Sequence, residues 1–234
     1  MSLDWTPPRS WMPPAHLAGH HARLEKLRPD HAEDLWSRMA GHDEIWQWLP
    51  DGPFGALSEY REHIERQAAS SDPVFYAIGS ADGWSGVGSL LRLDRANGVI
   101  EIGHLCFAPA LQRTPAATEA VFLFAKTAFD GGFRRLEWKC NAMNAPSRRA
   151  ALRYGFAFEG VFRQHMVVKG RNRDTAWFSI LDREWPFLRP AFEAWLDPGN
   201  FDPHGRQRRA LSDMIAQIVR NLDRGSTAEG MPKV

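Results

Sequence analysis

A strand, a short loop and a helix follow one another without interruption between Ile100 and Ala120. Thr114 is a good N-cap and Pro115 a good first residue for the helix. The first-turn N–H groups of a helix have no partner inside it, so here they point back toward the end of the strand. A helix start of this kind binds anions such as phosphate. We therefore expect an anion site near Thr114.

The elements around this unit predict an α/β fold with a mixed central sheet and flanking helices. Strands 74–107 form an antiparallel meander, whereas the strand, helix, strand, helix order after residue 99 favours parallel pairing. A last hairpin is expected around the polar turn Lys169–Asp174. The predicted strands are 23–27, 74–78, 86–93, 99–107, 135–141, 158–168 and 175–181, and the predicted helices follow residue 30 and cover 58–69, 115–129 and 146–153.

The 234 residues divide into one catalytic-size domain and two additions. Residues 1–19 are rich in proline and are expected to form a surface arm, residues 20–185 form the domain, and residues 186–234 form a C-terminal helical extension. The apolar stripe of the last helix must bury against the domain or a second copy, so a homodimer is possible. It contains Leu211, Met214, Ile215, Ile218, Val219 and Leu222.

Composition excludes several classes of protein. A net charge of +1 gives no global reason to bind nucleic acid or an anionic membrane. Cys106 and Cys140 are too few for a disulfide framework or zinc cluster, so we expect reduced core thiols and no metal. Prolines interrupt the first twenty residues, which excludes a signal peptide or membrane span there. We expect a soluble, cytoplasmic protein.

Several motifs occur in a recognisable order. The loop before the central helix reads Gln112-Arg113-Thr114-Pro115-Ala116-Ala117, and it is followed by Asn144-Ala145-Pro146-Ser147, Gly155-Phe156, Glu159-Gly160, Arg163, Asp174 and Glu184-Trp185. The chain thereby resembles the GNAT N-acetyltransferase superfamily, whose pyrophosphate loop reads Gln or Arg, two residues, Gly, one residue, then Gly or Ala. The order and spacing are similar to the ribosomal-protein N-terminal acetyltransferase branch over residues 20–185.

The resemblance implies direct transfer of an acetyl group from acetyl-CoA, a co-substrate, to a primary amine of a protein N-terminus, peptide or small molecule. The pantetheine arm would pair with the exposed strand edge from Leu105 to Phe107 and bond Asn144, which can also cap the helix before Pro146. The pyrophosphate would contact Gln112, Arg113, Thr114, Ala116, Ala117 and Thr118. The motif glycine is replaced by Pro115, which removes one amide donor, and the Arg113 guanidinium can compensate.

Direct transfer needs a group that protonates the departing thiolate. Many family members use a tyrosine at the position of Ala151, but the ribosomal branch places a serine where Ser147 stands. Ser147 is therefore the expected catalytic acid. Tyr154 is out of register and is interpreted as a helix-end packing residue.

For the catalytic base we expect Glu101. Period-two alternation places it on the strand face of Gly103, Leu105 and Phe107, with His104 and Cys106 opposite. The alternative is that Glu101 forms a cross-strand charge pair and that His104 is an ordinary hydrogen-bonded sheet histidine. Glu137 and His165 are weaker candidates for the base.

The acceptor wall is expected in the aromatic loop with Trp46, Trp48 and Phe54, together with His104. The same loop could simply pack a helix pair onto the sheet. Two other functions are open: a non-catalytic acyl-CoA-binding regulatory module, suggested by Pro115 and the missing tyrosine, and a structural or nucleic-acid-associated protein. The latter would use Arg171, Arg173, Arg206, Arg208 and Arg209, and the near-neutral charge disfavours it.

Overall fold

A computed structural model describes residues 4–228, with side chains up to residue 220. Over these residues eight strands form one sheet in the order β1-β2-β3-β4-β5-β6-β8-β7. The strands are β1 His16–Ala18, β2 Arg23–Lys26, β3 Val74–Ser80, β4 Gly83–Asp94, β5 Val99–Phe107, β6 Arg135–Asn141, β7 Ala157–Val168 and β8 Arg171–Leu181. The helices are α1 Ala32–Met39, α2 Leu57–Ala68, α3 Pro115–Asp130, α4 Ala145–Arg153, α5 Trp185–Leu196 and α6 Leu211–Ala228.

The sheet is mixed, as expected, because β5 and β6 run parallel and the other neighbours run antiparallel. The parallel pairing begins at Val99 with Arg135 and ends at Ile102 with Trp138. Beyond this point β6 stays paired with β8 as far as Asn141, while β5 stays paired with β4. The two parallel strands therefore separate toward their carboxyl ends.

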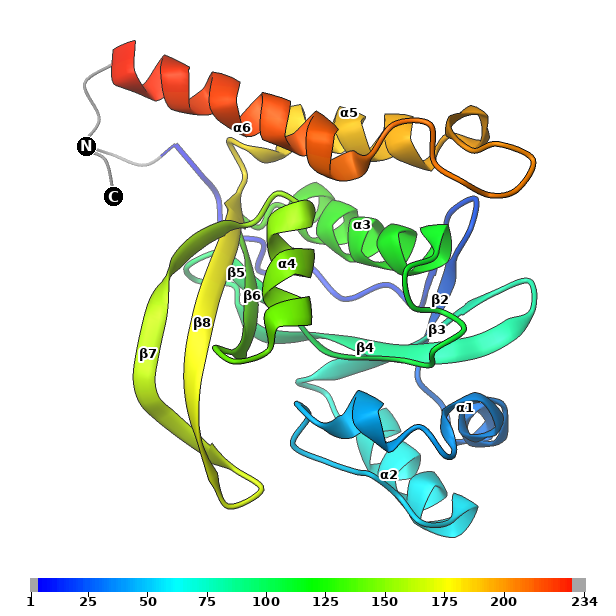
Figure 1. Cartoon of the computed structure of the whole chain (residues 1–234). Coiled ribbons are helices and arrows are strands. Elements are labelled where there is room, and N and C mark those ends of the chain that lie inside the picture. Colours follow the sequence, from blue (N-terminus) through cyan, green and yellow to red (C-terminus); the bar gives the residue numbers. More distant parts are fainter. Residues whose placement is uncertain (1–3, 229–234) are drawn as a thin grey trace.

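Helices cover both faces of the sheet (Figure 1). The α1–α2 face is packed by a smaller core that contains Leu35 and Tyr60. The opposite face, which we call the α3 face, carries the larger core beneath α3 to α6, with Phe124 and Phe178 fully buried. Successive β3 residues alternate between the two cores: Tyr76 and Ile78 join the larger core and Phe75 and Ala77 the smaller one.

The N-terminal segment packs on the domain, although we predicted a surface arm. The Trp11 ring lies edge-on to Phe133 at 4.9 Å between centroids, and the Tyr76 hydroxyl donates to the Pro14 carbonyl at 2.7 Å. Three further residues form β1, which pairs with β2. This edge strand is too short to show a sequence period.

The C-terminal extension packs on the same domain. Leu211, Met214 and Ile215 are buried in the core of the α3 face, so this part of the predicted apolar stripe finds its partner within the chain. Leu222, the last predicted stripe residue, lies outside the described side chains. Over the described residues, no helix has the length and apolar content of a membrane span.

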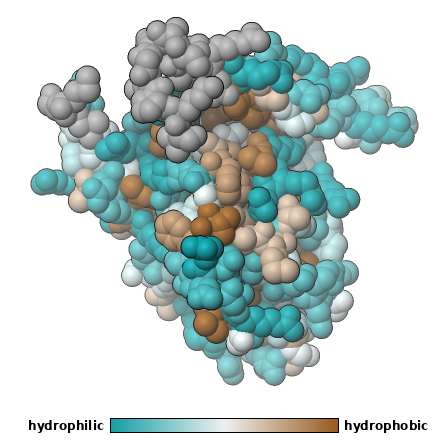
Figure 2. All heavy atoms as spheres, turned by 60° about the vertical axis from the view of Figure 1, so that its left-hand side comes forward, coloured by the Kyte–Doolittle hydropathy of each residue, from teal (hydrophilic) through white to brown (hydrophobic). Residues whose placement is uncertain are grey.

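The last hairpin differs from the prediction. Its turn is only Lys169 and Gly170, both with positive φ, and β8 begins at Arg171. This tight primed turn matches the twist of the strands. The edge strand β7 exposes several large apolar side chains, and Figure 2, viewed from that side, shows brown residues among hydrophilic ones. They are Phe158, Val161, Phe162, Met166 and Val167.

A buried carboxylate ties the N-terminal segment to α3. Glu119 is 2% exposed, and its two oxygens accept from the backbone N–H groups of His20, His21 and Ala22 at 2.8, 2.5 and 2.6 Å. These charge-assisted bonds satisfy the carboxylate. They also fix the start of β2 over the first half of α3.

We predict that Glu119→Gln lowers the free energy of unfolding by about 3 kcal/mol, because an amide cannot accept three N–H bonds and places its own donor against them. Urea unfolding monitored by circular dichroism measures this change. Glu193→Gln, on the exposed face of α5, is the matched control and is expected to be nearly neutral. Equal stability of the two variants would contradict the role of Glu119.

Candidate active site

The separation of β5 from β6 opens the sheet between the starts of α3 and α4. Asn144 caps α4, since its Oδ1 accepts from the Ser147 N–H at 3.1 Å. This confirms the predicted capping role of Asn144. The cap brings Ser147 to the β6 side of the opening, and the loop after Phe107 brings the α3 start to the β5 side.

The start of α3 is capped as predicted, but it holds fewer free donors than expected. Thr114 Oγ1 accepts from the Ala117 N–H at 3.2 Å, the Thr114 N–H donates to Leu111, and the Thr118 N–H returns to Thr114. Among the described residues, the amides of Arg113 and Ala116 are left without an acceptor. Arg113 has φ of 63°, a left-handed conformation that favours glycine. The anion site therefore reduces to two backbone donors and the Arg113 guanidinium.

Two other predicted CoA contacts are engaged within the chain. The Gln112 side chain donates to the Phe107 carbonyl at 2.9 Å, so this part of the β5 edge already has a partner. Thr118 Oγ1 accepts from Arg153 at 3.1 Å, which links α3 to α4. Both side chains therefore stabilise the segments that border the opening.

Ser147 has an unusual pair of neighbours. Its Oγ accepts from the Trp138 indole N–H at 3.0 Å. Cys140 lies nearby on the same strand, and burial raises the pKa of its thiol. Trp138 and Cys140 lie on β6, at the point where β5 departs. Because a hydroxyl oxygen that accepts from an indole still carries its own proton, Ser147 can donate into the opening.

Tyr154 does not take the place of the tyrosine that many family members use as the catalytic acid. Ala151 is fully buried, and burial raises the pKa of Tyr154, which packs beside Trp138 and Phe192. Tyr154 is a core residue, as interpreted from the sequence.

A bulge in β5 overturns the predicted division of its faces. His104 has φ of 50°, and the pairing with β4 jumps from Gly103 opposite Ser89 to Cys106 opposite Val87. The extra residue reverses the alternation. Leu105 and Phe107 therefore pack against the core of the α3 face. Glu101, Gly103, His104 and Cys106 share the α1–α2 face instead.

Glu101 forms the charge pair that was the alternative expectation. Its side chain is 6% exposed and accepts from Lys139 Nζ at 2.8 Å and from Arg92 at 2.9 Å. Lys139 also contacts Glu137 at 3.1 Å and lies 3.7 Å from the centre of the Trp177 ring. This cluster of charges fills the vertex where β5 and β6 part.

The weaker candidates for the base are also engaged. Arg135 donates to Glu137 at 2.9 Å, in addition to the Lys139 contact. His165 Nδ1 lies 3.0 Å from Thr175 Oγ1 in the β7–β8 hairpin, between the rings of Phe162 and Trp177. None of these contacts brings Glu137 or His165 close to Ser147.

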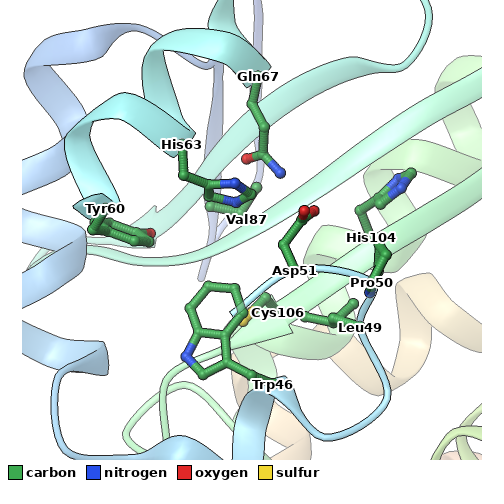
Figure 3. Close-up of a pocket in the computed structure, with 10 residues that line it drawn as sticks. All are labelled: Trp46, Leu49, Pro50, Asp51, Tyr60, His63, Gln67, Val87, His104 and Cys106. Atoms are coloured by element: carbon green, nitrogen blue, oxygen red, sulfur yellow. The ribbon is translucent and has the colours of Figure 1, made fainter. Parts of the chain in front are cut away.

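A small cavity lies on the α1–α2 face beside His104 (Figure 3). Its volume of about 10 Å³ suits roughly one water molecule. Lys169, from the tip of the β7–β8 hairpin, donates to the Trp46 carbonyl at 2.9 Å and so joins the hairpin to the aromatic loop. The lining residues are Trp46, Leu49, Pro50, Asp51, Tyr60, His63, Gln67, Val87, His104 and Cys106.

The predicted acceptor wall is only partly assembled here. Trp46 and His104 line the cavity, but Trp46 is only 6% exposed and also belongs to the core of the α1–α2 face. Phe54 packs behind it, with its ring 4.7 Å from that of His63. Trp48 is half-buried and is not among the lining residues. The loop thus also packs the helix pair onto the sheet, which was the alternative.

Three polar lining residues, Asp51, His63 and Gln67, escaped the sequence analysis. His63 lies on the buried stripe of α2 between Tyr60 and Ile64, and a histidine at that spacing was the available signal. Asp51 follows Pro50 in an irregular loop and carries no pattern. Burial lowers the pKa of His63 and of His104, while the Asp51 carboxylate opposes both shifts. Among the described residues no group of three His, Cys, Asp or Glu side chains is placed to hold a metal.

Comparison with known proteins gives the family of this fold. The GNAT acetyltransferase domain matches residues 21–157, more than half of the chain. The chain belongs to the GNAT acetyltransferase family. It is therefore an acyltransferase, and the family uses acetyl-CoA as its acetyl donor. The predicted family, fold class and enzyme class are confirmed.

Individual relatives agree with this assignment. A GCN5-related N-acetyltransferase from Brucella melitensis is 46% identical, with a TM-score of 0.87 over 91% of this chain and 99% of the other. A GNAT-family protein from Chromobacterium violaceum is 43% identical, with a TM-score of 0.74 over 80% and 95%. The Bacillus subtilis protein "Putative ribosomal N-acetyltransferase YdaF" is 28% identical over 70% of this chain and 93% of its own length.

The buried histidines predict an acid-sensitive fold. Burial lowers the pKa of His31, His63 and His104 below the ordinary value of 6.5, so the unfolded chain binds more protons than the folded chain as pH falls through that value. We expect the free energy of unfolding to drop by about 1 kcal/mol or more between roughly pH 7 and pH 5. Urea unfolding across this range measures the drop, and His63→Gln should reduce it. Unchanged stability would contradict the assigned pKa shifts.

Proposed function

We propose that this chain transfers the acetyl group of acetyl-CoA directly to a primary amine that reaches the thioester from the α1–α2 face. The observation that carries the proposal is the opening between β5 and β6. Ser147 lies on one side of it, and a small cavity whose lining includes Asp51, His63 and His104 lies on the other face of the sheet. A thioester that lies at this point of the sheet has the Ser147 proton donor on one side, and the acceptor amine can reach it from the other.

The starts of α3 and α4 support the proposed position of acetyl-CoA. The pyrophosphate would lie at the Arg113 and Ala116 amides and the Arg113 guanidinium, with Thr114 as the cap that orients them. The pantetheine arm would run along the part of β5 that has left β6, near Leu105, toward Asn144. Both segments border the opening, so the thioester would lie beside Ser147.

Ser147 is proposed as the acid. As the C–S bond breaks, charge develops on sulfur, and the Ser147 hydroxyl can donate its proton because its oxygen already accepts from Trp138. The carboxylate of Glu101, which the sequence predicted as the base, is already shared by Lys139 and Arg92, so Ser147 is the only acid–base residue that this proposal requires.

The acceptor is proposed to be a primary amine on a protein N-terminus, a peptide or a small molecule. The name of the Bacillus subtilis relative, a ribosomal N-acetyltransferase, favours a protein amine. The cavity holds only about one water, so only the amino group and its nearest atoms would enter it. The rest of the acceptor would lie over the aromatic loop and the hairpin tip.

An amine panel tests the proposal. The purified chain is mixed with acetyl-CoA and either small amines or peptides with free N-termini, and free thiol is measured. Thiol release with at least one amine, and acetylated product by mass spectrometry, are expected. Acetyl-CoA binding without turnover on any amine would identify a non-catalytic acyl-CoA-binding module instead.

We predict that Thr114→Glu weakens CoA binding by roughly tenfold or more, because a carboxylate at the α3 start repels the pyrophosphate. Isothermal titration calorimetry measures the affinity. Thr114→Ser keeps the capping hydroxyl and is the matched control, expected to bind nearly as the wild type. Unchanged affinity in Thr114→Glu would place the phosphates elsewhere.

We also predict that Ser147→Ala lowers kcat by about a hundredfold while acetyl-CoA affinity stays nearly unchanged, because the proton is needed only as the thiolate forms. Stopped-flow thiol release, under conditions where chemistry limits the rate, measures kcat. Ser212→Ala, at an exposed position on α6, is the control. Full turnover in Ser147→Ala would mean that solvent protonates the thiolate and that the serine only positions α4.

A further inference from the structure

His104 occupies the bulge of β5, at the level where β5 has left β6. The last paired residue of β6 is Trp138, whose indole N–H donates to Ser147 Oγ at 3.0 Å, and Lys139 is the next residue beyond the pairing. Ser147 and His104 therefore border the same opening, Ser147 in the first turn of α4 and His104 on the α1–α2 face. This is the arrangement that direct transfer needs, with one proton leaving the amine and another reaching the sulfur.

Ser89 orients the His104 ring through Nδ1. Ser89 Oγ donates to the Gly103 carbonyl at 3.1 Å and lies 2.9 Å from His104 Nδ1. A serine hydroxyl has one proton, so with that proton on Gly103 the oxygen can only accept from the ring. In that arrangement Nδ1 carries the hydrogen and Nε2 has the free lone pair, which is the tautomer that proton transfer to Nε2 requires. Ser89 is the only hydrogen-bond partner of this ring among the described residues.

We propose that His104, oriented by Ser89, removes the proton from the attacking amine. This inference rests on the proposed function of the same site. A C–N bond forms between the amine and the acetyl carbon, the C–S bond breaks, the amine proton passes to His104 Nε2, and the thiolate takes the Ser147 proton. Solvent then returns the proton from the imidazolium to the serine, so the products are the acetylated amine and free CoA thiol.

The surroundings of His104 suit this role. The charged and titratable groups that face it are Asp51 from the loop, His63 from α2, Arg92 from β4 and Arg173 from β8. Burial, with a contribution from the two arginines, lowers the pKa of His104 below 6.5, so the ring is neutral near neutral pH. Asp51, drawn between the two histidines in Figure 3, stabilises the imidazolium once it forms.

Glu101 is less suited to the same step. Its carboxylate is already shared by Lys139 and Arg92 at the vertex of the opening, and the bulge separates it from Leu105 and Phe107. Protonation of Glu101 would leave Lys139, whose side chain is 5% exposed, with one fewer counter-charge. We assign Glu101 to the charge cluster and the proton transfer to His104.

The positive φ of His104 allows a direct test, because glycine adopts φ of 50° without strain. His104→Gly removes the imidazole without disturbing the bulge, and added imidazole can fill the space. Gln164→Gly is the matched control, since Gln164 also has φ of 50° but lies in β7. Thiol release is measured with the most active amine of the panel, with and without imidazole.

We expect His104→Gly to lose about a hundredfold in kcat/KM, with unchanged acetyl-CoA affinity and partial recovery in imidazole. Gln164→Gly should keep full activity. In the wild type kcat/KM should fall as pH drops through the lowered His104 pKa, and His104→Gln should lose this acid limb, whereas Glu101→Gln should keep it.

Full activity of both His104 variants, or loss of the acid limb in Glu101→Gln alone, would overturn the assignment to His104. A wild-type chain that is inactive on every amine would instead overturn the proposed function. The two failures are therefore distinguished by whether the wild type turns over.

Discussion

The parallel pairing of β5 with β6 stops after Ile102 and Trp138, and the rest of the site depends on this interruption. Two strands that continued side by side would close the sheet and separate its two faces completely. Since β6 stays bonded to β8 and β5 to β4, each strand is held in place while they part. The start of α3 follows β5, the start of α4 follows β6, and the bulge at His104 lies in the part of β5 beyond the last residue paired with β6.

Buried charge stabilises the point of separation. Lys139 lies between Glu101 and Glu137 and against the Trp177 ring, so its ammonium is paired on several sides. A buried cation that lost these partners would cost several kcal/mol, which makes the cluster a structural requirement of the vertex. The carboxylate that sequence alternation favoured as the base thus has a structural role here, and the bulge presents a histidine toward the cavity instead.

Much of the fold was predictable because its signals are local. The Thr114 cap, the Asn144 cap and the alternation of the strands each follow from a few neighbouring residues. The bulge was not, because nothing in a histidine at position 104 announces a positive φ. Its consequence was large, since one extra residue exchanged the faces of Leu105 and Cys106. The small cavity was also missed, since Asp51 in the loop and His63 and Gln67 on α2 are brought together only by the fold.

The central claim is that the acetyl donor crosses the sheet where β5 and β6 separate. A crystal structure of the chain with acetyl-CoA tests it most directly. The account predicts pyrophosphate density at the Arg113 and Ala116 amides, sulfur within hydrogen-bond reach of Ser147 Oγ, and the acetyl carbon facing His104 on the α1–α2 side. Acetyl-CoA bound with its sulfur away from this opening, or with its acetyl group turned from His104, would contradict it.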